Sequence, residues 1–162
     1  MKRLPIAALA VLALAGPAAA QNAAQIRSAA AGANCPGCNL FQADFANREL
    51  KGRNFSRARL RQADLSTAVM NRTSFARADL RDVNAYGGVF SAASFAGADL
   101  TNASFVGAYL QGANFAGATL TGANFSGAEM DRAAGLTQRQ LDGACGDEAT
   151  RLPRGLRIRA CR

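Results

Sequence analysis

Four cysteines are the side chains of this chain best suited to chemistry. Two form the motif Cys35-Pro36-Gly37-Cys38, and the others are Cys145 and Cys161. A C-x-x-C pair can exchange disulfides when it lies at a helix N-terminus in a βαβ unit, and the sequence shows no such unit. Haem attachment is excluded because Asn39 follows the motif and the chain has no histidine. We favour structural cysteines, with a free buried thiol at Cys38 and a redox or metal role as alternatives.

Other side chains offer little catalytic chemistry. Histidine, the commonest general base, is absent from the chain. Asp64, Asp79 and Asp99 recur at one position of a repeat, which is typical of hydrogen bonding in turns. The glycines mark corners of that repeat and form no phosphate-binding loop. We therefore expect no enzymatic activity, no cofactor and no metal.

Arginines are the remaining functional candidates, and they are unevenly distributed in a chain of net charge +8. Between Ala46 and Asp82 there are nine basic residues and four acidic ones, whereas Asp99 is the one charged residue from Val83 to Ala128. From Arg132 to the end, seven arginines accompany three acids. This distribution favours an anionic partner.

The first twenty residues have the composition of a secretory signal peptide. Lys2 and Arg3 precede an apolar core from Ile6 to Ala15, and three alanines follow a Gly-Pro break. The core is too short for a membrane anchor. The sequence therefore predicts cleavage before Gln21 and export to a bacterial periplasm or beyond, with no membrane span after processing.

Beyond this segment, a large apolar residue falls on every fifth position from Leu40 to Met130, with Ala85 as the one weak member. A small residue, usually alanine, stands two places before each large one. Neither a helix, with its period of 3.6, nor a strand, with its period of 2, would keep this series on one side. Each five-residue unit therefore offers one large and one small residue to a core.

A second period of twenty residues predicts the shape. In two of the four columns, every fourth unit repeats the same large residue, so four units close one turn and like residues stack. The result is a square coil with five residues per side, in which nearly five turns make a rod of roughly 23 Å. The two clearest columns are Leu40, Leu60, Leu80, Leu100 and Leu120, and Phe55, Phe75, Phe95 and Phe115.

The corners differ between the two halves of the repeat region. In the second half, the residue two places after each large one is glycine or asparagine, which suits the positive φ of a type II turn. In the first half, we expect a different turn, because that position holds Arg57, Gln62, Thr67, Arg72, Arg77 and Asp82.

The unit also has a recurring sequence. Ala-Asp-Leu occupies 63–65, 78–80 and 98–100, and Ala-Asn-Phe occupies 113–115. This pattern resembles the pentapeptide-repeat family from Cys38 to about Arg132. The resemblance implies an all-β solenoid, specifically a right-handed quadrilateral β-helix with, in this chain, short helical caps. We divide the chain into a signal peptide (1–20), an N-terminal cap (21–37), the β-helix (38–132) and a C-terminal capping helix with a disulfide-closed tail (133–162).

Two places depart from the pattern. Arg48 and Arg53 occupy small inward positions, where a charge is costly to bury. Either the first turn is loose and the side chains of these arginines reach solvent past the open end of the coil, or regular stacking begins near Ala58. The stretch 83–88 combines the small Ala85 with two glycines, and we expect a thinner core there, with a bulge as one form it could take.

Both ends of an open β-helix need caps that prevent end-to-end pairing. Residues 23–31 favour a short helix over the first turn. The spacing Thr137-Gln138-Arg139-Gln140 is that of a capping box and predicts a helix through Leu141. The tail, residues 151–162, contains three large apolar residues and should fold back.

The cysteines lie before and after the repeats. An even number in an exported chain favours disulfides, with three possible pairings. We favour Cys35–Cys38 and Cys145–Cys161, because bonded cysteines keep their Cα atoms within about 7 Å and the ends of the rod are farther apart.

In the square coil, arginines stack on one another. Stacked like charges repel unless carboxylates intervene, and Arg59 over Asp79 could form one compensating pair. The surface is either an ordinary solvated one of mixed charge or a binding face for an anionic partner. The candidate face comprises Arg57, Arg61, Arg77 and Arg81.

The sequence thus favours a non-catalytic exported module that binds a protein or an anionic envelope component. One alternative is the DNA mimicry of family members that bind type II topoisomerase and protect it from quinolones, which uses an acidic surface inside the cell. A thiol–disulfide protein using Cys35 and Cys38 is the other. Nucleic-acid binding fits the charge, but export would make it incidental. A homodimer is compatible with the sequence.

Overall fold

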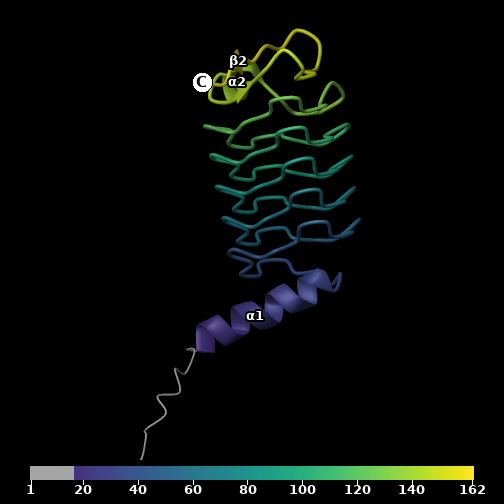
Figure 1. The fold of residues 1–162 in the computed structure, drawn as a ribbon, viewed down its shortest axis with the longest axis vertical. Coiled ribbons are helices and arrows are strands. Elements are labelled where there is room, and N and C mark those ends of the chain that lie inside the picture. The colour runs from purple at the N-terminus through teal and green to yellow at the C-terminus, as the bar shows by residue number, and fades with distance from the viewer. Residues whose placement is uncertain (1–16) are drawn as a thin grey trace, which may run out of the picture.

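A computed structural model describes residues 17–162 of the chain. The apolar core of the predicted signal peptide, Ile6–Ala15, lies outside the described residues. Helix α1 (Pro17–Ala30) lies across one end of a regular coil, and helix α2 (Gln138–Leu141) with strands β1 (Cys145–Gly146) and β2 (Arg159–Ala160) lies at the other end (Figure 1). Among residues 17–162, neither helix combines the length and hydropathy that a membrane span requires.

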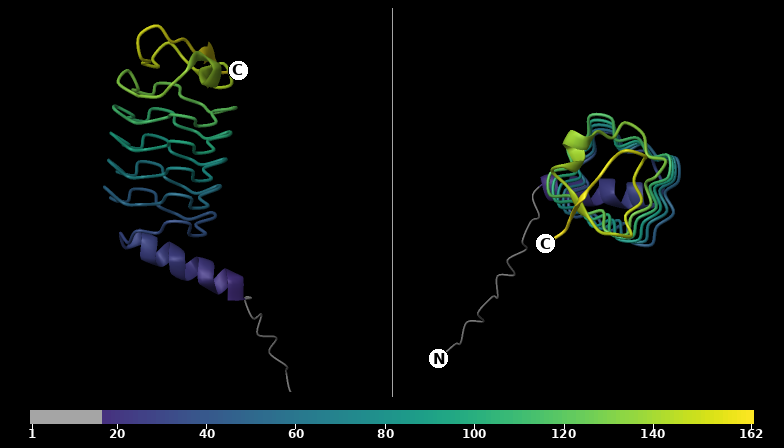
Figure 2. Two further views of the ribbon diagram at one scale, coloured as in Figure 1. Left: turned by 180° about the vertical axis from the view of Figure 1, so that it is seen from behind. Right: turned by 90° about the horizontal axis from the view of Figure 1, so that it is seen from above.

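The coil repeats every twenty residues. Parallel bridges join residues twenty apart, from Asn39 with Arg59 to Asn114 with Ala134, and backbone hydrogen bonds already join Cys35 to Asn54. Residues 35–134 therefore make five turns of twenty residues, which stack along a common axis (Figure 2). The twenty-residue period is confirmed, and so is the right-handed quadrilateral β-helix that the family resemblance implies.

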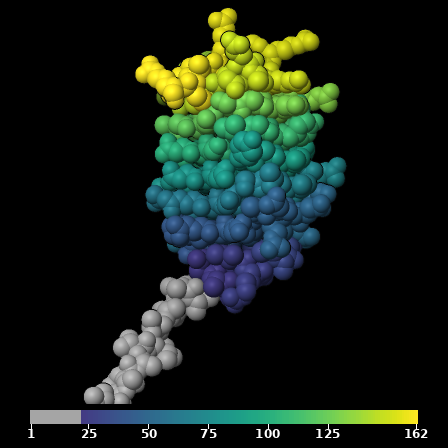
Figure 3. Space-filling view, viewed as in Figure 1, coloured from purple at the N-terminus to yellow at the C-terminus, as the bar shows by residue number. Residues whose placement is uncertain are grey.

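The inward series fills the coil completely. Every residue of the series from Leu40 to Met130 is buried, including Ala85, and the space-filling view shows the turns closely packed along the rod (Figure 3). Phenylalanines stack along the axis: the rings of Phe75 and Phe95 are 5.3 Å apart and those of Phe95 and Phe115 are 5.2 Å apart. Such aromatic pairs add about 0.5–1.5 kcal/mol each beyond the area they bury.

The corners from Gly37 to Gly127 share one backbone conformation, and the expected difference between the two halves is wrong. Arg57 and Arg77 have φ of 58°, against 65° for Gly117 in the same column. In the turn at Arg57, the amide of Ala58 donates to the carbonyl of Phe55, as in a type II turn. The amide of Arg57 also donates to Ala76 in the next turn at 2.9 Å. This stacking bond holds even an unsuitable residue in the left-handed region.

The stretch 83–88 keeps its register, so a bulge there is wrong. Asn84 bridges both Asp64 below and Ser104 above. The reason is a compensation inside the core: a Cβ on Gly88 would lie 2.5 Å from Cε2 of Phe90, so the ring of Phe90 lies over this glycine. The ring centroids of Phe90 and Phe105 are also 5.7 Å apart, and Phe105 is the residue one turn above the small Ala85.

The first turn stacks regularly although it carries two arginines at inward positions. Val69 donates to the carbonyl of Arg48, and Ser74 donates to that of Arg53, while both arginine side chains are exposed. Stacking therefore begins well before Ala58. The guanidinium of Arg53 lies beside Gly32, with Nε 3.7 Å from the position of a Cβ there. A cation at this place suits the C-terminal end of α1.

Helix α1 closes the lower end of the coil. It covers residues 23–30 of the helix expected at 23–31 and starts earlier, at Pro17. Ala29 is buried, and the side chain of Gln25 accepts a hydrogen bond from the amide of Asn39 at 2.7 Å. That contact satisfies a backbone donor at the open edge of the first turn.

The C-terminal residues close the upper end as an irregular sixth turn. Asn124 bridges Cys145 and Glu129 bridges Arg151, at spacings one and two residues longer than the regular twenty. The capping box at Thr137 is present, as predicted, and the Gln140 side chain also donates to the carbonyls of Phe115 and Ala118 at 2.9 Å. The tail folds back as expected, with its apolar residues packed against the core: Leu152, Leu156 and Ile158.

The strain at the corners makes a testable prediction. Ala92 has φ of 55° and Gly117 has φ of 65°. Ala92→Gly should raise the free energy of unfolding by up to about 1 kcal/mol, because it removes the Cβ from a left-handed position, and Gly117→Ala should lower it by about 1 kcal/mol. Urea denaturation of both variants measures the two changes. Since a Cβ on Gly117 meets no atom within 4 Å, a loss there reports backbone strain alone.

The packing of Phe90 over Gly88 makes a second prediction. Gly88→Ala should destabilise the chain by about 1–3 kcal/mol, because the new Cβ displaces the Phe90 ring. Adding Phe90→Leu should recover part of that loss, since it recreates the pair Ala108 and Leu110 that the next turn uses. Thermal unfolding of the two single variants and the double variant gives the coupling free energy between positions 88 and 90. Additive losses would show that the ring and the glycine are independent.

Candidate functional site

The four candidate arginines lie along the two edges of one side of the coil. We call this the mixed-charge side, whose outward residues are Asn39, Arg59, Asp79, Asp99 and Thr119, bridged in that order. Arg57 and Arg77 occupy the corner before this side, and Arg61 and Arg81 occupy the corner after it. The structure therefore brings the four arginines to one side but separates them into two pairs, each stacked one turn apart.

Arg81 is held by carboxylates. Its guanidinium contacts both oxygens of Asp79, with Nη2 2.6 Å from Oδ2 and Nε 2.7 Å from Oδ1, and Nε lies 3.7 Å from Asp99. The side-chain hydrogen bond from Arg81 is the main cause that lowers the pKa of Asp79 below its ordinary value, and it also raises the pKa of Arg81. Asp79 therefore pairs with Arg81 and not, as expected, with Arg59. The contact is bidentate, a geometry that the planar guanidinium group favours.

Arg61 is paired as well. Its Nε lies 3.3 Å from Oδ2 of Asp82 in the turn above. Arg59, Arg61, Asp79 and Arg81 line a shallow depression of about 390 Å³ together with Asn39 and Phe41. Arg61 and Arg81 of this depression are thus paired with carboxylates, whereas Arg59 has no carboxylate within 4.0 Å among the described residues.

Arg57 and Arg77 differ from the other pair. Both are exposed, and within residues 17–162 no carboxylate oxygen lies within 4.0 Å of either guanidinium. Glycines follow them in the same corner column at 97 and 117. The column therefore presents positive charge only in the lower turns, without a counter-charge.

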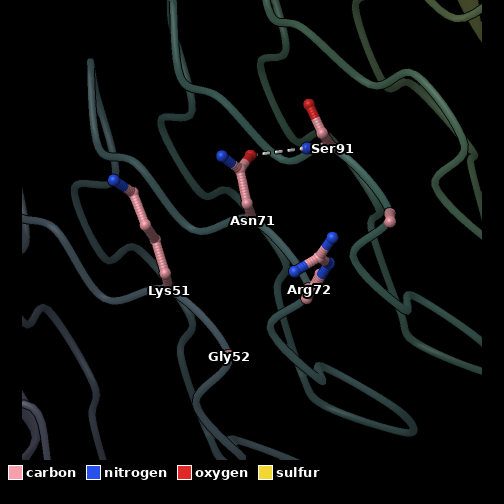
Figure 4. A pocket seen from close by; sticks show the side chains of 6 residues that line it. Lys51, Gly52, Asn71, Arg72 and Ser91 are labelled. Carbon is pink, nitrogen blue, oxygen red and sulfur yellow. Dashed lines mark hydrogen bonds between the residues drawn. The ribbon is translucent and has the colours of Figure 1, made fainter.

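A second basic corner was missed by the sequence argument. Lys51 and Arg72 line a depression of about 540 Å³ with Gly52, Asn71, Ser91 and Ala92. Figure 4 shows Lys51 and Arg72 on either side of Asn71, whose Oδ1 accepts a hydrogen bond from the amide of Ser91 at 3.0 Å. Lys51 has one exposed counter-ion, Glu49 at 3.1 Å. The sequence signal was available: both residues stand at the same corner, one turn apart.

The cysteines form two disulfides in the described structure. Cys35 pairs with Cys38 in the first turn of the coil, and Cys145 pairs with Cys161 beside the parallel strands β1 and β2. The C-x-x-C motif follows the C-terminal end of α1 and lies at no helix N-terminus. Within residues 17–162, no group of three or more His, Cys, Asp or Glu side chains is placed to hold a metal ion.

Together, the coil and its corners define the class of protein: a β-solenoid of five-residue units that presents columns of side chains on four sides. Eight copies of the pentapeptide-repeat family model match residues 54–91 and 89–127, which lie within the regular coil. The regular coil is therefore built of pentapeptide repeats.

Solved structures of similar sequence are pentapeptide-repeat proteins. HetL, involved in heterocyst differentiation regulation in the cyanobacterium Nostoc sp. strain PCC 7120, is 26% identical over 73% of this chain and 59% of its own, with a TM-score of 0.45. A protein of the Arabidopsis thaliana thylakoid lumen is 30% identical over 60% of this chain and 63% of its own, with a TM-score of 0.33.

QnrB1, a plasmid-mediated fluoroquinolone resistance protein, is 18% identical over 78% of this chain and 79% of its own, with a TM-score of 0.41. The chain thus spans 59% and 63% of the lengths of HetL and the thylakoid protein. Among curated protein sequences, none matches it.

The Asp79–Arg81 pair makes a testable prediction about charge. Arg81→Gln should raise the pKa of Asp79 toward its ordinary value of 3.8, which a carboxyl-carbon NMR titration measures. Because the pKa of Asp79 is lower in the folded state than in the unfolded state, the pair stabilises the fold above the unfolded pKa. That contribution is lost as pH falls through the folded pKa. Arg77→Gln is the control and should leave the titration of Asp79 unchanged.

Proposed function

We propose that this chain is a pentapeptide-repeat protein that acts as a non-catalytic interaction module and binds an anionic partner through the basic lower turns of its rod. The observation that carries the proposal is the position of the uncompensated cations. Arg57, Arg72 and Arg77 project from corners of a rigid coil and have no carboxylate within 4.0 Å among the described residues. A fixed array of unpaired charge attracts and orients an oppositely charged surface.

The proposal includes export. Disulfides persist in oxidising compartments, and the structure supports two of them. Together with the signal-peptide composition of the first twenty residues, they favour a periplasmic or secreted protein cleaved before Gln21. The partner is then a protein or another anionic component of the cell envelope.

The two other functions have less support. DNA mimicry needs a strongly acidic surface, and the lower turns of this coil carry unpaired arginines. A thiol–disulfide enzyme needs a reactive cysteine near a helix N-terminus, whereas the side chain of Cys35 is 6% exposed and its amide is bonded into the coil.

The proposal predicts salt-sensitive binding. Purified protein used as bait should retain envelope components at low salt and release them at high salt, because screening weakens contacts between exposed charges. Replacing Lys51, Arg57, Arg72 and Arg77 by glutamine should abolish most of the retention, because among the described residues these cations of the lower turns are unpaired or only weakly paired.

The matched control replaces four exposed arginines of the C-terminal cap by glutamine, which changes the net charge equally: Arg139, Arg154, Arg157 and Arg162. Equal losses of retention in the two variants would indicate attraction by net charge alone. Retention that does not depend on salt concentration would contradict the proposal. Circular dichroism checks that both variants keep the fold.

A further inference from the structure

One side of the coil differs from the other three because it carries cations along both edges and no acid between them. We call it the serine side, whose outward residues are Asn54, Ser74, Ser94 and Asn114, bridged in that order. Arg57 and Arg77 form one edge, at the corner shared with the mixed-charge side. Lys51 and Arg72 form the other edge, beside the depression of Figure 4.

The cations of these edges are available for a partner. Within residues 17–162, Arg57, Arg72 and Arg77 have no carboxylate within 4.0 Å, while Arg61 and Arg81 across the mixed-charge side are paired. Lys51 contacts Glu49, but these side chains are 55% and 71% exposed, and such an exposed pair adds little. Three cations that have no carboxylate partner among the described residues therefore flank the serine side.

The surface between the edges is small, polar and flat. The side-chain oxygens of Asn54 and Asn114 accept hydrogen bonds from the amides of Ser56 and Ala116. Their amide nitrogens, and the hydroxyls of Ser74 and Ser94, take part in no hydrogen bond among the described residues. This surface can therefore donate to and accept from the backbone of a chain laid along it.

The dimensions fit an extended peptide. Cations on successive turns are about 4.8 Å apart along the rod, and the three extended residues between the corners separate the edges by roughly 10 Å. In an extended peptide, successive side chains point to opposite sides. A peptide lying along the rod axis would thus direct alternate side chains toward the Arg57–Arg77 edge and the Lys51–Arg72 edge.

We propose that the serine side binds an extended acidic peptide segment of a partner protein, with carboxylates paired to both cationic edges. This inference rests on the proposed function and names the class of its partner. Nucleic-acid strands and lipid surfaces fit less well, because single strands stack on aromatic side chains and membrane-surface proteins insert apolar ones. The exposed large apolar residues of the described chain lie elsewhere, at Phe41, Tyr86 and Tyr109.

Two fluorescein-labelled peptides of equal composition test the two-edged geometry. In Gly-Gly-Glu-Glu-Glu-Glu-Gly-Gly, an extended peptide directs two carboxylates to each edge, whereas in a Glu-Gly repeat of the same length all four carboxylates point to one side. At low salt, fluorescence anisotropy should give at least threefold tighter binding for the peptide with four consecutive glutamates. Equal affinities would overturn the proposed geometry.

Matched variants locate the site. Arg72→Gln with Arg77→Gln removes one cation from each edge and should weaken binding about tenfold, whereas Arg61→Gln with Arg81→Gln removes the same charge from paired positions and should change it less than twofold. Ser74→Glu should block binding by placing a carboxylate between the edges. Ser104→Glu, at the equivalent outward position of another side, should not.

Other anions separate this inference from the proposed function. A sulfated glycan, phosphatidylglycerol vesicles and a single-stranded oligonucleotide are tested with the same variants. If one of these binds through Arg72 and Arg77 while both peptides fail, the acidic-peptide partner is wrong but anionic binding stands. If neither the peptides nor the envelope components bind in a salt-dependent way, the proposed function fails as well.

Discussion

The structure depends on one constraint: each turn must close in twenty residues so that its amides meet the carbonyls of the next turn. The bridges satisfy this condition from Asn39–Arg59 to Asn114–Ala134 without interruption. Every position within a unit then has a fixed role, whether inward, outward or at a corner. The corner is the clearest case, because the amide of Arg77 donates to Ala96 at 2.9 Å and holds an arginine at a φ of 58°. A residue in that conformation costs about 1–2 kcal/mol, and the stacked neighbours on both sides maintain it.

The same constraint organises the surface. Outward residues form columns, and a cation is neutralised or left free according to whether its side chain reaches the carboxylates beside it. Arg77 and Arg81 flank the same column, that of Asp79 and Asp99, from its two corners; Arg81 is bound by it, whereas Arg77 has no carboxylate within 4.0 Å among the described residues. The distribution of unpaired charge on the rod therefore depends on the position of each side chain at its corner, more than on total charge.

Most of the coil could be predicted from the sequence, because the five-residue and twenty-residue periods of its large apolar residues can be read directly from the sequence. The turn type at Arg57 could not, since the local preference of arginine opposes the conformation that stacking imposes. The regular register at 83–88 depends on the ring of Phe90 lying over Gly88, which is a packing relation between side chains. The partner of Asp79 likewise depends on side-chain reach: register places Arg59 below it, and the guanidinium of Arg81 reaches it instead.

The uniform corner has a consequence for how such a protein changes length over evolutionary time. Because the corners from Gly37 to Gly127 share the left-handed conformation and every side has five residues, duplication or deletion of twenty residues adds or removes one turn and leaves all other columns aligned. A change of five residues would instead rotate everything above it by a quarter turn and bring different columns together. Insertion of whole turns lengthens the existing columns of outward side chains. Insertion of a single five-residue unit instead places different columns next to one another.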